Sequence, residues 1–559
     1  MKVSIMVQRC NRQSLFARQA MAAITWLLLT GIGTVSADTA DAVDCSDSES
    51  ISVHCGQAPS AVYDATGRLW VVFAQNQHAY VANSSDHGAT FSSPVRVNAS
   101  AENIEVNGEN RPKVLTDDAG EVIYVSWTQK TEGQHTGDIR FSRSINSGAS
   151  FAPVRTVNDD GLLTSHRFDS LFLTESGHLY LTWLDKRELE YAAQRGDDYT
   201  GSGVFYTVSD DQGESFAANR KIADHSCECC RIAVAPHGED GMALMWRHVF
   251  DGTTRDHAIA AIGPDGVRAP FGRATVDEWQ IDACPHHGPD MTLGADTDGE
   301  ATYHMTWFSA GDLHKGIYYG RHDLASGKTR LVTQIDGNAG ASHPQVAERQ
   351  GVQHLVWKRF DGSQTQVLWI FSQDEGSSWS EPQVLASTDN ASDHPLLLEG
   401  PDQLRLSWHT RNDGYQVIAL PEPGLDIKAF TADSFAQIKR ERAGQPFVLA
   451  LWSVDCPPCM VELDLLGRLR QEDPDLPLVL VSTDAMDLKA DAEDFLRDYG
   501  LDDMTSWMFA DDYAAPLRFS IDPQWYGELP RSYYFDAQHQ SEAHSGIMTE
   551  AQLRSWLAL

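Results

Sequence analysis

The stretch GHLYLTW, at residues 177–183, joins a glycine turn to alternating apolar residues and a closing tryptophan. Leu179, Leu181 and Trp183 fall on every second position, the pattern of a strand with one buried face. Six other stretches share the pattern: GRLWVVF (67–73), GEVIYVSW (120–127), GMALMW (241–246), GEATYHMTW (299–307), GVQHLVW (351–357) and DQLRLSW (402–408). Their aromatic ends lie about 50 to 63 residues apart, the length of one four-stranded propeller blade. With no helical periodicity here, the sequence predicts an all-β propeller over residues 51–420, of six or seven blades with seven preferred.

Four copies of a second motif lie between these strands. They fit Ser-x-Asp/Asn-x-Gly-x-x-aromatic and read SSDHGATF (84–91), SINSGASF (144–151), SDDQGESF (209–216) and SQDEGSSW (372–379). Asp or Asn caps a tight turn, Gly takes the positive φ, and the aromatic residue fills a gap between outer strands. The motif resembles the Asp box of sialidase-like β-propellers, and it implies a fold rather than an activity. Degenerate copies are expected near residues 264–266 and 325–327.

Charge and the N-terminal sequence restrict the class of protein. The chain has 559 residues, with 43 Lys and Arg against 79 Asp and Glu and a formal net charge of −36. A surface with this much negative charge repels phosphate backbones. Nucleic acid is therefore not an expected partner. A basic stretch (2–18), an apolar run (20–32) and the small residues 35–37 predict a secretory signal over residues 1–37. We therefore expect a linker at residues 38–50 and a periplasmic protein, with an uncleaved N-terminal membrane anchor as the alternative.

A second domain follows the propeller. Residues 421–427 begin with Pro-Glu-Pro-Gly, a stiff linker sequence. Residues 428–559 alternate strand and helix patterns, which predicts an α/β domain. Within it, the apolar run 447–452 predicts a buried central strand. Cys456-Pro457-Pro458-Cys459 then begins a helix, whose predicted apolar face consists of Met460, Leu463, Leu466 and Leu469.

The position of the cysteine pair predicts redox chemistry. A cysteine at a helix N-terminus meets the helix dipole and unpaired amides, so the pKa of Cys456 is expected to fall. Cys456 is then the attacking nucleophile, and Cys459 resolves the mixed disulfide. An inert disulfide staple or half of a zinc site is the alternative. A staple closing so short a loop constrains little chain entropy, and a zinc site needs a second pair that this domain lacks.

Over roughly residues 428–559 the chain resembles the TlpA-like branch of the thioredoxin superfamily. The family pattern W-x-x-x-C-P-P-C-x-x-E is matched by Trp452, Cys456, Pro457, Pro458, Cys459 and Glu462. The stretch GELPRSYYF (527–535) fits the family's cis-proline loop, which implies Pro530 as a cis-proline packed against the active-site disulfide. The resemblance implies reductase chemistry without a cofactor. Electrons would arrive from a membrane donor and leave to exported proteins that carry thiols or disulfides.

Two positions depart from the family pattern. Ala450 lies six residues before Cys456, where thioredoxins often have an acidic proton acceptor, so the acceptor is left unassigned. Asp455 directly precedes the nucleophile, where an aromatic residue is common. The second departure leaves the redox potential open.

A second group of possible ligands, cysteines and histidines, lies in the propeller. Its members occupy one slot, the loop before the innermost strand of a blade. Its members are Cys227, Cys229, Cys230, Cys284, His286 and His287. The same slot in other blades holds His54, Cys55, His166, His343 and His394. Such loops open on one face around the central channel, so these residues are expected to converge.

Three interpretations of this group stay open. Thiolates and imidazoles favour Cu(I) or Zn, and haem iron is conceivable through histidine. Alternatively, Cys229 or Cys230 pairs with Cys284, and Cys45 pairs with Cys55, as structural disulfides. A thiol substrate site is the third interpretation.

The sequence therefore favours an exported thiol–disulfide oxidoreductase, a reductase, fused to a propeller that binds a metal or a protein partner. A sialidase-like glycoside hydrolase is the alternative, because Asp-box propellers include sialidases. Sialidases need three arginines and a Tyr–Glu pair, usually with an Arg-Ile/Leu-Pro start, and Arg111-Pro112 is the nearest approach here. A non-catalytic binding propeller is a third possibility.

Overall fold

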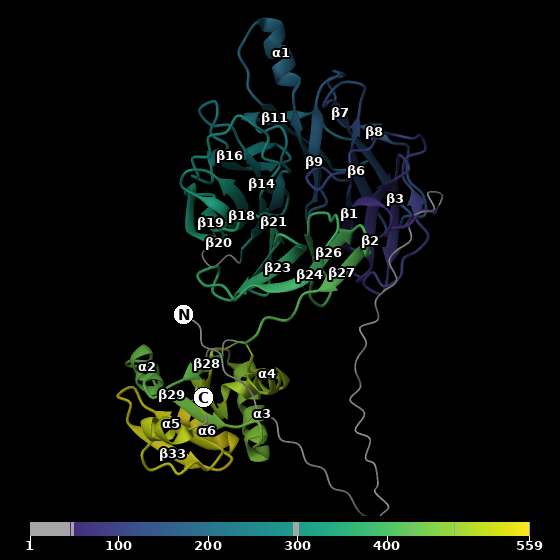
Figure 1. Ribbon diagram of the computed structural model, residues 1–559. Coiled ribbons are helices and arrows are strands. Elements are labelled where there is room, and N and C mark those ends of the chain that lie inside the picture. Colours follow the sequence, from purple (N-terminus) through teal and green to yellow (C-terminus); the bar gives the residue numbers. More distant parts are fainter. Residues whose placement is uncertain are drawn as a thin grey trace, which may run out of the picture.

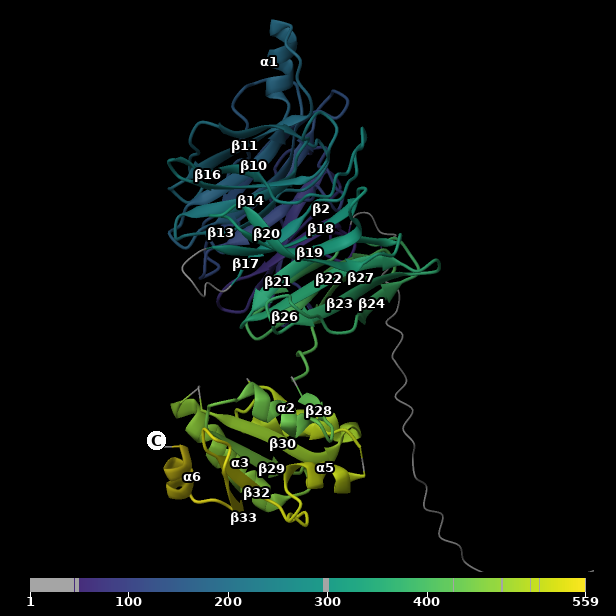
Figure 2. The same ribbon diagram turned by 90° about the vertical axis from the view of Figure 1, so that its left-hand side faces the viewer.

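The computed structural model describes residues 45, 50–294, 301–425, 427–473, 476–502, 504–511 and 513–557. The expected signal (1–37) and most of the linker at 38–50 lie outside the described residues. The described chain forms seven antiparallel sheets in succession, followed by one mixed sheet with helices (Figures 1 and 2). In the figures the seven sheets run from purple to green, and the α/β domain continues from green to yellow.

Six of the seven sheets have four strands, and the seventh has three among the described residues. Blades 1 to 3 consist of β1 (Gln57–Tyr63), β2 (Leu69–Gln75), β3 (His78–Ser84), β4 (Val95–Arg96); β5 (Lys113–Thr116), β6 (Ile123–Lys130), β7 (Gly137–Ser144), β8 (Arg155–Thr156); β9 (His166–Leu173), β10 (Leu179–Asp185), β11 (Ser202–Ser209) and β12 (Arg220–Ser226). Blades 4 to 7 consist of β13 (Ala233–His237), β14 (Gly241–Arg247), β15 (His257–Gly263), β16 (Gly266–Arg273); β17 (Asp290–Leu293), β18 (Thr302–Ala310), β19 (Lys315–Asp323), β20 (Lys328–Asp336); β21 (Ala341–Arg349), β22 (Val352–Phe360), β23 (Thr365–Ser372), β24 (Gln383–Thr388); β25 (Leu396–Glu399), β26 (Leu404–Thr410) and β27 (Gly414–Ala419). The first strands of consecutive blades contact one another, and β25 contacts β1, so the ring closes. The prediction of a seven-bladed propeller is confirmed.

The tryptophans that close the repeated pattern form the core between blades. Each lies on the second strand of its sheet and is at most 1% exposed: Trp127, Trp183, Trp246, Trp307, Trp357 and Trp408. Between blades 4 and 5, Met245 and Ile259 belong to the same apolar cluster as Tyr303 and Trp307. The period-two pattern therefore identified the side chains that hold neighbouring sheets together.

Each Asp box is a turn between the third and fourth strands of a blade. In the first copy the Ser84 hydroxyl donates to Oδ1 of Asp86 (2.7 Å) and accepts from the N–H of Gly88 (2.8 Å). Asp86 also accepts from the N–H of Thr90 (2.9 Å), and Gly88 has a φ of +90°. The other three copies repeat these bonds. Because the turn satisfies its own amides, it holds its shape at the edge of the sheet.

The aromatic residue that ends an Asp box packs against the neighbouring blade. Trp379 lies edge-on to Tyr319 of blade 5, with ring centroids 4.9 Å apart. Phe91 of blade 1 lies 6.0 Å from Tyr415 of blade 7, a contact that joins the first and last blades. The stretches where degenerate copies were expected lie at the equivalent turns between third and fourth strands, at the β15–β16 turn and at the β19–β20 turn.

Blade 3 carries a helix that the alternating pattern did not predict. α1 (Arg187–Arg195) is inserted between β10 and β11 and projects from the propeller in both views (Figures 1 and 2). Its stretch RELEYAAQR consists of good helix formers, and Gly196 ends it with a φ of +76°. The expectation that helical structure is absent from this region is wrong here. Only Arg187 and Ala192 of this nine-residue helix are buried, and the helix is too short to stand out among the strand repeats.

The C-terminal domain has one six-stranded mixed sheet in the order β28-β31-β30-β29-β32-β33. Its elements are β28 (Ile427–Phe430), α2 (Ser434–Glu441), β29 (Phe447–Trp452), α3 (Pro457–Glu472), β30 (Leu478–Ala485), the short 3₁₀ helix η1 (Met486–Leu488), α4 (Lys489–Asp498), β31 (Ser506–Phe509), α5 (Ala514–Ile521), β32 (Arg531–Phe535), β33 (Ser541–Ser545) and α6 (Glu550–Leu557). The strands β28, β31, β30 and β29 run parallel to one another, β32 runs antiparallel to β29, and β33 runs antiparallel to β32. No helix in the described part of the chain is long and apolar enough to cross a membrane.

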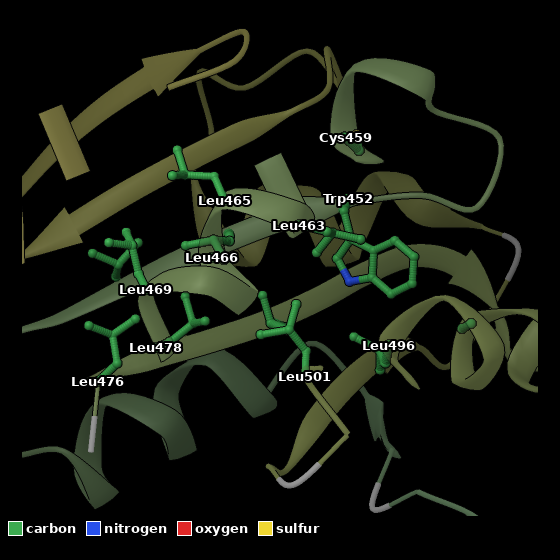
Figure 3. Close-up of a cluster of buried hydrophobic side chains, with 14 of the residues drawn as sticks. Trp452, Cys459, Leu463, Leu465, Leu466, Leu469, Leu476, Leu478, Leu496 and Leu501 are labelled. Atoms are coloured by element: carbon green, nitrogen blue, oxygen red, sulfur yellow. The ribbon is translucent and has the colours of Figure 1, made fainter. Parts of the chain in front are cut away.

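β29 is the buried central strand that its apolar run predicted. Val448, Ala450 and Trp452 face a cluster with α3, α4 and α6, part of which Figure 3 shows. Leu449 and Leu451 face the opposite cluster, with α2 and α5. Helices therefore cover both faces of the strand, which explains its lack of alternation.

Candidate functional site

The cysteine pair lies where β29 ends and α3 begins. Cys456 is the N-cap of α3, and its Sγ accepts a hydrogen bond from the N–H of Cys459 (3.2 Å). The two cysteines form a disulfide, in which Cys456 is half-buried and Cys459 is fully buried. A partner in solvent therefore reaches Cys456 first. Pro457 and Pro458 have no N–H, so after reduction the N–H of Cys459 and the dipole of α3 are the groups that favour a thiolate on Cys456.

A carboxylate from the neighbouring strand holds the loop before Cys456. Asp484, at the end of β30, accepts hydrogen bonds from the Ser453 hydroxyl (2.7 Å) and the Val454 N–H (2.8 Å). It also accepts from the hydroxyl of Ser482 (2.6 Å). Asp484 was not predicted from the sequence, although its position at the end of an apolar parallel strand is a signal for a functional side chain.

Glu462 is a buried carboxylic acid one helical turn after Cys459. It is 3% exposed and accepts hydrogen bonds from the Ser532 hydroxyl and the Met548 N–H (3.2 Å). Ser532 pairs with Ala450 across β29 and β32, so the carboxyl lies beside the strand position that lacks an acid. Burial raises the pKa of Glu462. Glu462 is the candidate for the proton acceptor that the sequence left unassigned.

Pro530 lies immediately before β32, and the Leu529–Pro530 peptide bond is cis. β32 runs antiparallel to β29 with Arg531 opposite Leu451, so Pro530 comes level with the end of β29. Leu529 packs against the apolar cluster that contains Cys459. The fold thus brings the two C-terminal sequence motifs side by side.

The cysteine-rich loop of the propeller connects β12 to β13. Sγ of Cys227 lies 3.5 Å from that of Cys229, which lies 3.9 Å from that of Cys230. All three residues are at most 4% exposed, and their sulfur atoms lie within 4.8 Å of one another. Hydrogen bonds from Cys229 and Cys230, together with the charges of Arg247 and Arg255, hold the pKa of Cys227 well below its usual range. We call these three residues the thiol trio.

The remaining predicted ligands line a cavity beside the thiol trio. The cavity has a volume of about 790 Å³, and Cys229, Cys284, His286 and His287 are among its lining residues. Cys284 is an exposed thiol and is not in the group of closely spaced sulfur atoms. The proposed bridge from Cys229 or Cys230 to Cys284 is therefore absent from the described residues. Cys45 and Cys55 do form a disulfide.

A carboxylate that the sequence analysis missed occupies the same channel mouth. Glu109 is 4% exposed and accepts hydrogen bonds from the N–H of Gly288 (2.8 Å) and from the backbone and guanidinium of Arg231 (both 2.9 Å). Its Oε1 lies 3.7 Å from both Nε2 of His343 and Nδ1 of His394, whose rings stack with centroids 3.4 Å apart. The slot before each innermost strand identified the two histidines. Glu109 lies in the same slot, in the loop before β5 (Lys113–Thr116) of blade 2, but it was not predicted because only cysteine and histidine were considered as ligands there.

His166 converges on a different group. Its Nε2 lies 3.1 Å from Asp160 and 3.7 Å from Asp185, and Arg187 bonds to Asp185 through its backbone N–H and its Nε. Although burial lowers it, hydrogen bonds to Asp138 and Asp160 raise the pKa of His166 to about 9. A protonated imidazole and a guanidinium already balance these carboxylates, so the group is an ion-pair network.

The arginine nearest to a sialidase pattern has a structural position. Arg111 is 6% exposed and donates to the carbonyl of Pro59, the carbonyl of Gly108 and the carboxylate of Asp393. Arg167 is the arginine among the residues that line the cavity, and it pairs with Glu105. The described cavity lining contains no tyrosine.

No protein-family model matches the chain, and no curated protein matches it. Among solved structures, an ulvan lyase from a new family of polysaccharide lyases is 12% identical, covering 65% of this chain and 92% of its own, with a TM-score of 0.44. A Hadza microbial sialidase is 13% identical, covering 66% of each chain, with a TM-score of 0.38. A secreted Mycobacterium tuberculosis disulfide oxidoreductase, homologous to E. coli DsbE, is 21% identical, covering 21% of this chain and 84% of its own, with a TM-score of 0.18.

The disulfide oxidoreductase corresponds to about a fifth of the chain. Likeness of this degree transfers no activity to the present chain.

Proposed function

We propose that the chain is a thiol–disulfide oxidoreductase whose C-terminal domain has a thioredoxin fold and acts as a reductase. The observation that supports this proposal is the order in which three side chains at the start of α3 become buried. Cys456 is half-buried at the helix N-cap, while Cys459 and Glu462 are buried behind it. Such layering exposes one sulfur to a partner and keeps the second sulfur, with its base, for the intramolecular step.

The reaction proceeds in two exchanges and starts from the dithiol. The Cys456 thiolate attacks one sulfur of a partner disulfide, forms a mixed disulfide and releases the partner's other sulfur as a thiolate. Cys459 then loses its proton to Glu462 and attacks Cys456, which forms the Cys456–Cys459 disulfide and frees the partner's second thiolate. Two electrons have passed to the partner. A donor dithiol must restore them by the reverse sequence.

We further propose that the reaction takes place in the periplasm. The N-terminal signal pattern supports export, and electrons would then come from a membrane donor. The partners are exported proteins that carry disulfides, and the redox domain itself uses no cofactor.

The proposal is tested by reduction of a model protein disulfide by the purified full chain. We expect Cys456→Ser to abolish the activity and Cys459→Ser to accumulate mixed disulfides, because the resolving thiol is missing. Cys284→Ser, which removes an exposed thiol outside this domain, is the matched control and keeps the wild-type rate. Undiminished activity in Cys456→Ser would overturn the assignment.

A second candidate function, cleavage of a carbohydrate by the propeller, is favoured by one observation. Glu105, Glu109 and Glu228 line the cavity of about 790 Å³ at the channel mouth, and glycoside cleavage uses paired carboxyl groups. Each of the three is ion-paired, to Arg167, Arg231 and Lys186 respectively. Release of sugar from sialylated, arabinan or uronate substrates, unaffected by Cys456→Ser, would support this candidate. No release from any of these substrates would remove it.

A further inference from the structure

The thiol trio is a group of nucleophilic side chains that the redox reaction does not use. Cys227, Cys229 and Cys230 fall within four positions of one loop, and the fold turns all three sulfur atoms inward to one point. A disulfide between two of them would leave the third unpaired.

The spacing of the sulfur atoms suits a bound ion. A metal with three sulfur ligands at about 2.3 Å places the sulfurs about 4 Å apart. The two shorter separations in the trio are 3.5 and 3.9 Å, and none exceeds 4.8 Å. A small adjustment of one side chain completes such a triangle.

Among the described residues, a buried cation beside the trio, Arg247, has no carboxylate partner. Arg247 is 1% exposed, and its guanidinium donates only to the carbonyls of Arg255, His287 and Phe308. Its Nε has no hydrogen-bond partner among the described residues. The backbone carbonyl of Arg247 bonds to the N–H of Cys227 (2.9 Å), so the two residues are neighbours. A buried positive charge is costly unless a negative charge accompanies it, and an anionic thiolate cluster supplies that charge.

The coordination number distinguishes between metals. Structural zinc is almost always bound by four ligands in a tetrahedron. Among the described residues, no fourth histidine or acidic ligand atom joins the three sulfur atoms within 4.8 Å. An all-sulfur, three-coordinate site favours a soft monovalent ion, with Cu(I) as the biological example.

We propose that Cys227, Cys229 and Cys230 bind one Cu(I) ion as a three-coordinate thiolate site. On binding, each thiol loses its proton to solvent and no electron is transferred. Cys229 also lines the open cavity, so the ion reaches the trio through the channel mouth. Cys284 lies outside the site, and His286 and His287 line the access path. The site does not depend on the reductase activity.

The test uses the full chain with Cys456→Ser and Cys459→Ser, so that the redox pair cannot bind copper. The reduced protein is loaded with Cu(I) without oxygen and challenged with a chromogenic Cu(I) chelator. X-ray absorption of the bound metal then counts its sulfur ligands. We expect one Cu(I) per chain with three sulfur ligands and no nitrogen ligand.

Two further substitutions locate the ion. Cys229→Ser should weaken Cu(I) binding at least tenfold, whereas Cys284→Ser should leave the affinity within twofold. Loss of all copper to the chelator, two or four sulfur ligands, or preferential retention of Zn(II) would each overturn the proposal. Because the ligand count is made without substitutions in the trio, the test stands even if Cys229→Ser does not fold.

Discussion

At the scale of single residues, the cysteine pair depends on groups that lie behind it. Glu462 reaches from α3 to Ser532 of β32, so the acid comes from the helix and not from the strand position of Ala450. The sequence could supply the motif and the order of attack. It could not assign the proton acceptor, because the contact between residues 462 and 532 exists only after the sheet has formed.

We predict that Glu462→Gln slows disulfide reduction by about 10²-fold, the usual loss when a positioned base is removed. The first attack by Cys456 should be nearly unaffected, so the mixed disulfide should accumulate in a rapid-quench experiment. Glu542→Gln, which alters an exposed acid on β33, is the control. Equal turnover in the two variants would remove Glu462 from the mechanism.

His166 should make the stability of the propeller depend on pH. Hydrogen bonds to Asp138 and Asp160 raise its pKa in the folded state to about 9, above the ordinary value of 6.5. The stabilisation is therefore complete below about pH 6.5 and is lost as the pH rises through about 9. Urea unfolding of the propeller should show this fall, and His166→Asn should remove it. The exposed His135→Asn should keep it; an unchanged slope in His166→Asn would contradict the account.

At the scale of elements, local patterns predicted most of the fold. The second strands of the blades, the Asp-box turns and β29 each carry a periodic or turn signal within ten residues. α1 was not predicted because it is a nine-residue insertion between two strands of the repeated pattern. The seven-bladed ring could be inferred from the number of repeats, since each repeat needs a neighbour to bury its tryptophan.

The Asp-box glycine should matter for inter-blade packing as well as for its φ. Gly376 and Gly177 share a φ of +85°, but a Cβ on Gly376 would lie 2.2 Å from the Tyr319 ring, whereas a Cβ on Gly177 would meet nothing within 4 Å. Gly177→Ala should lower the free energy of unfolding by about 1 kcal/mol through backbone strain. Gly376→Ala should lower it by about 1–3 kcal/mol more through overpacking. Equal losses in chemical denaturation would show that the contact with Tyr319 is unimportant.

At the scale of the whole molecule, the chain combines two domains with separate cores. The apolar clusters of the propeller and of the α/β domain share no residues. A protein truncated after Leu420 should therefore stay soluble, with a circular dichroism spectrum dominated by β-structure and unchanged Cu(I) binding. Aggregation of this truncated protein would show that the propeller needs the second domain.

The channel mouth shows what the sequence could and could not predict at this scale. The repeat period placed cysteines and histidines from distant blades around one channel, and the structure puts several of them on one cavity. Glu109 lies in the same kind of loop, but a single carboxylate there gave no ligand signal, and its partners Arg231 and His394 are about 120 and 285 residues away. Contacts between residues so far apart in the sequence form only when the ring of blades closes.

The most direct test of the account is the redox equilibrium of Cys456 and Cys459. The full chain is equilibrated in glutathione buffers of graded potential, quenched with an alkylating reagent and digested for mass spectrometry. We predict that this pair converts reversibly between dithiol and disulfide in one two-electron step, while Cys45–Cys55 stays oxidised as an internal reference. A Cys456–Cys459 disulfide that opens only under the conditions that open Cys45–Cys55 would contradict a role in thiol–disulfide exchange.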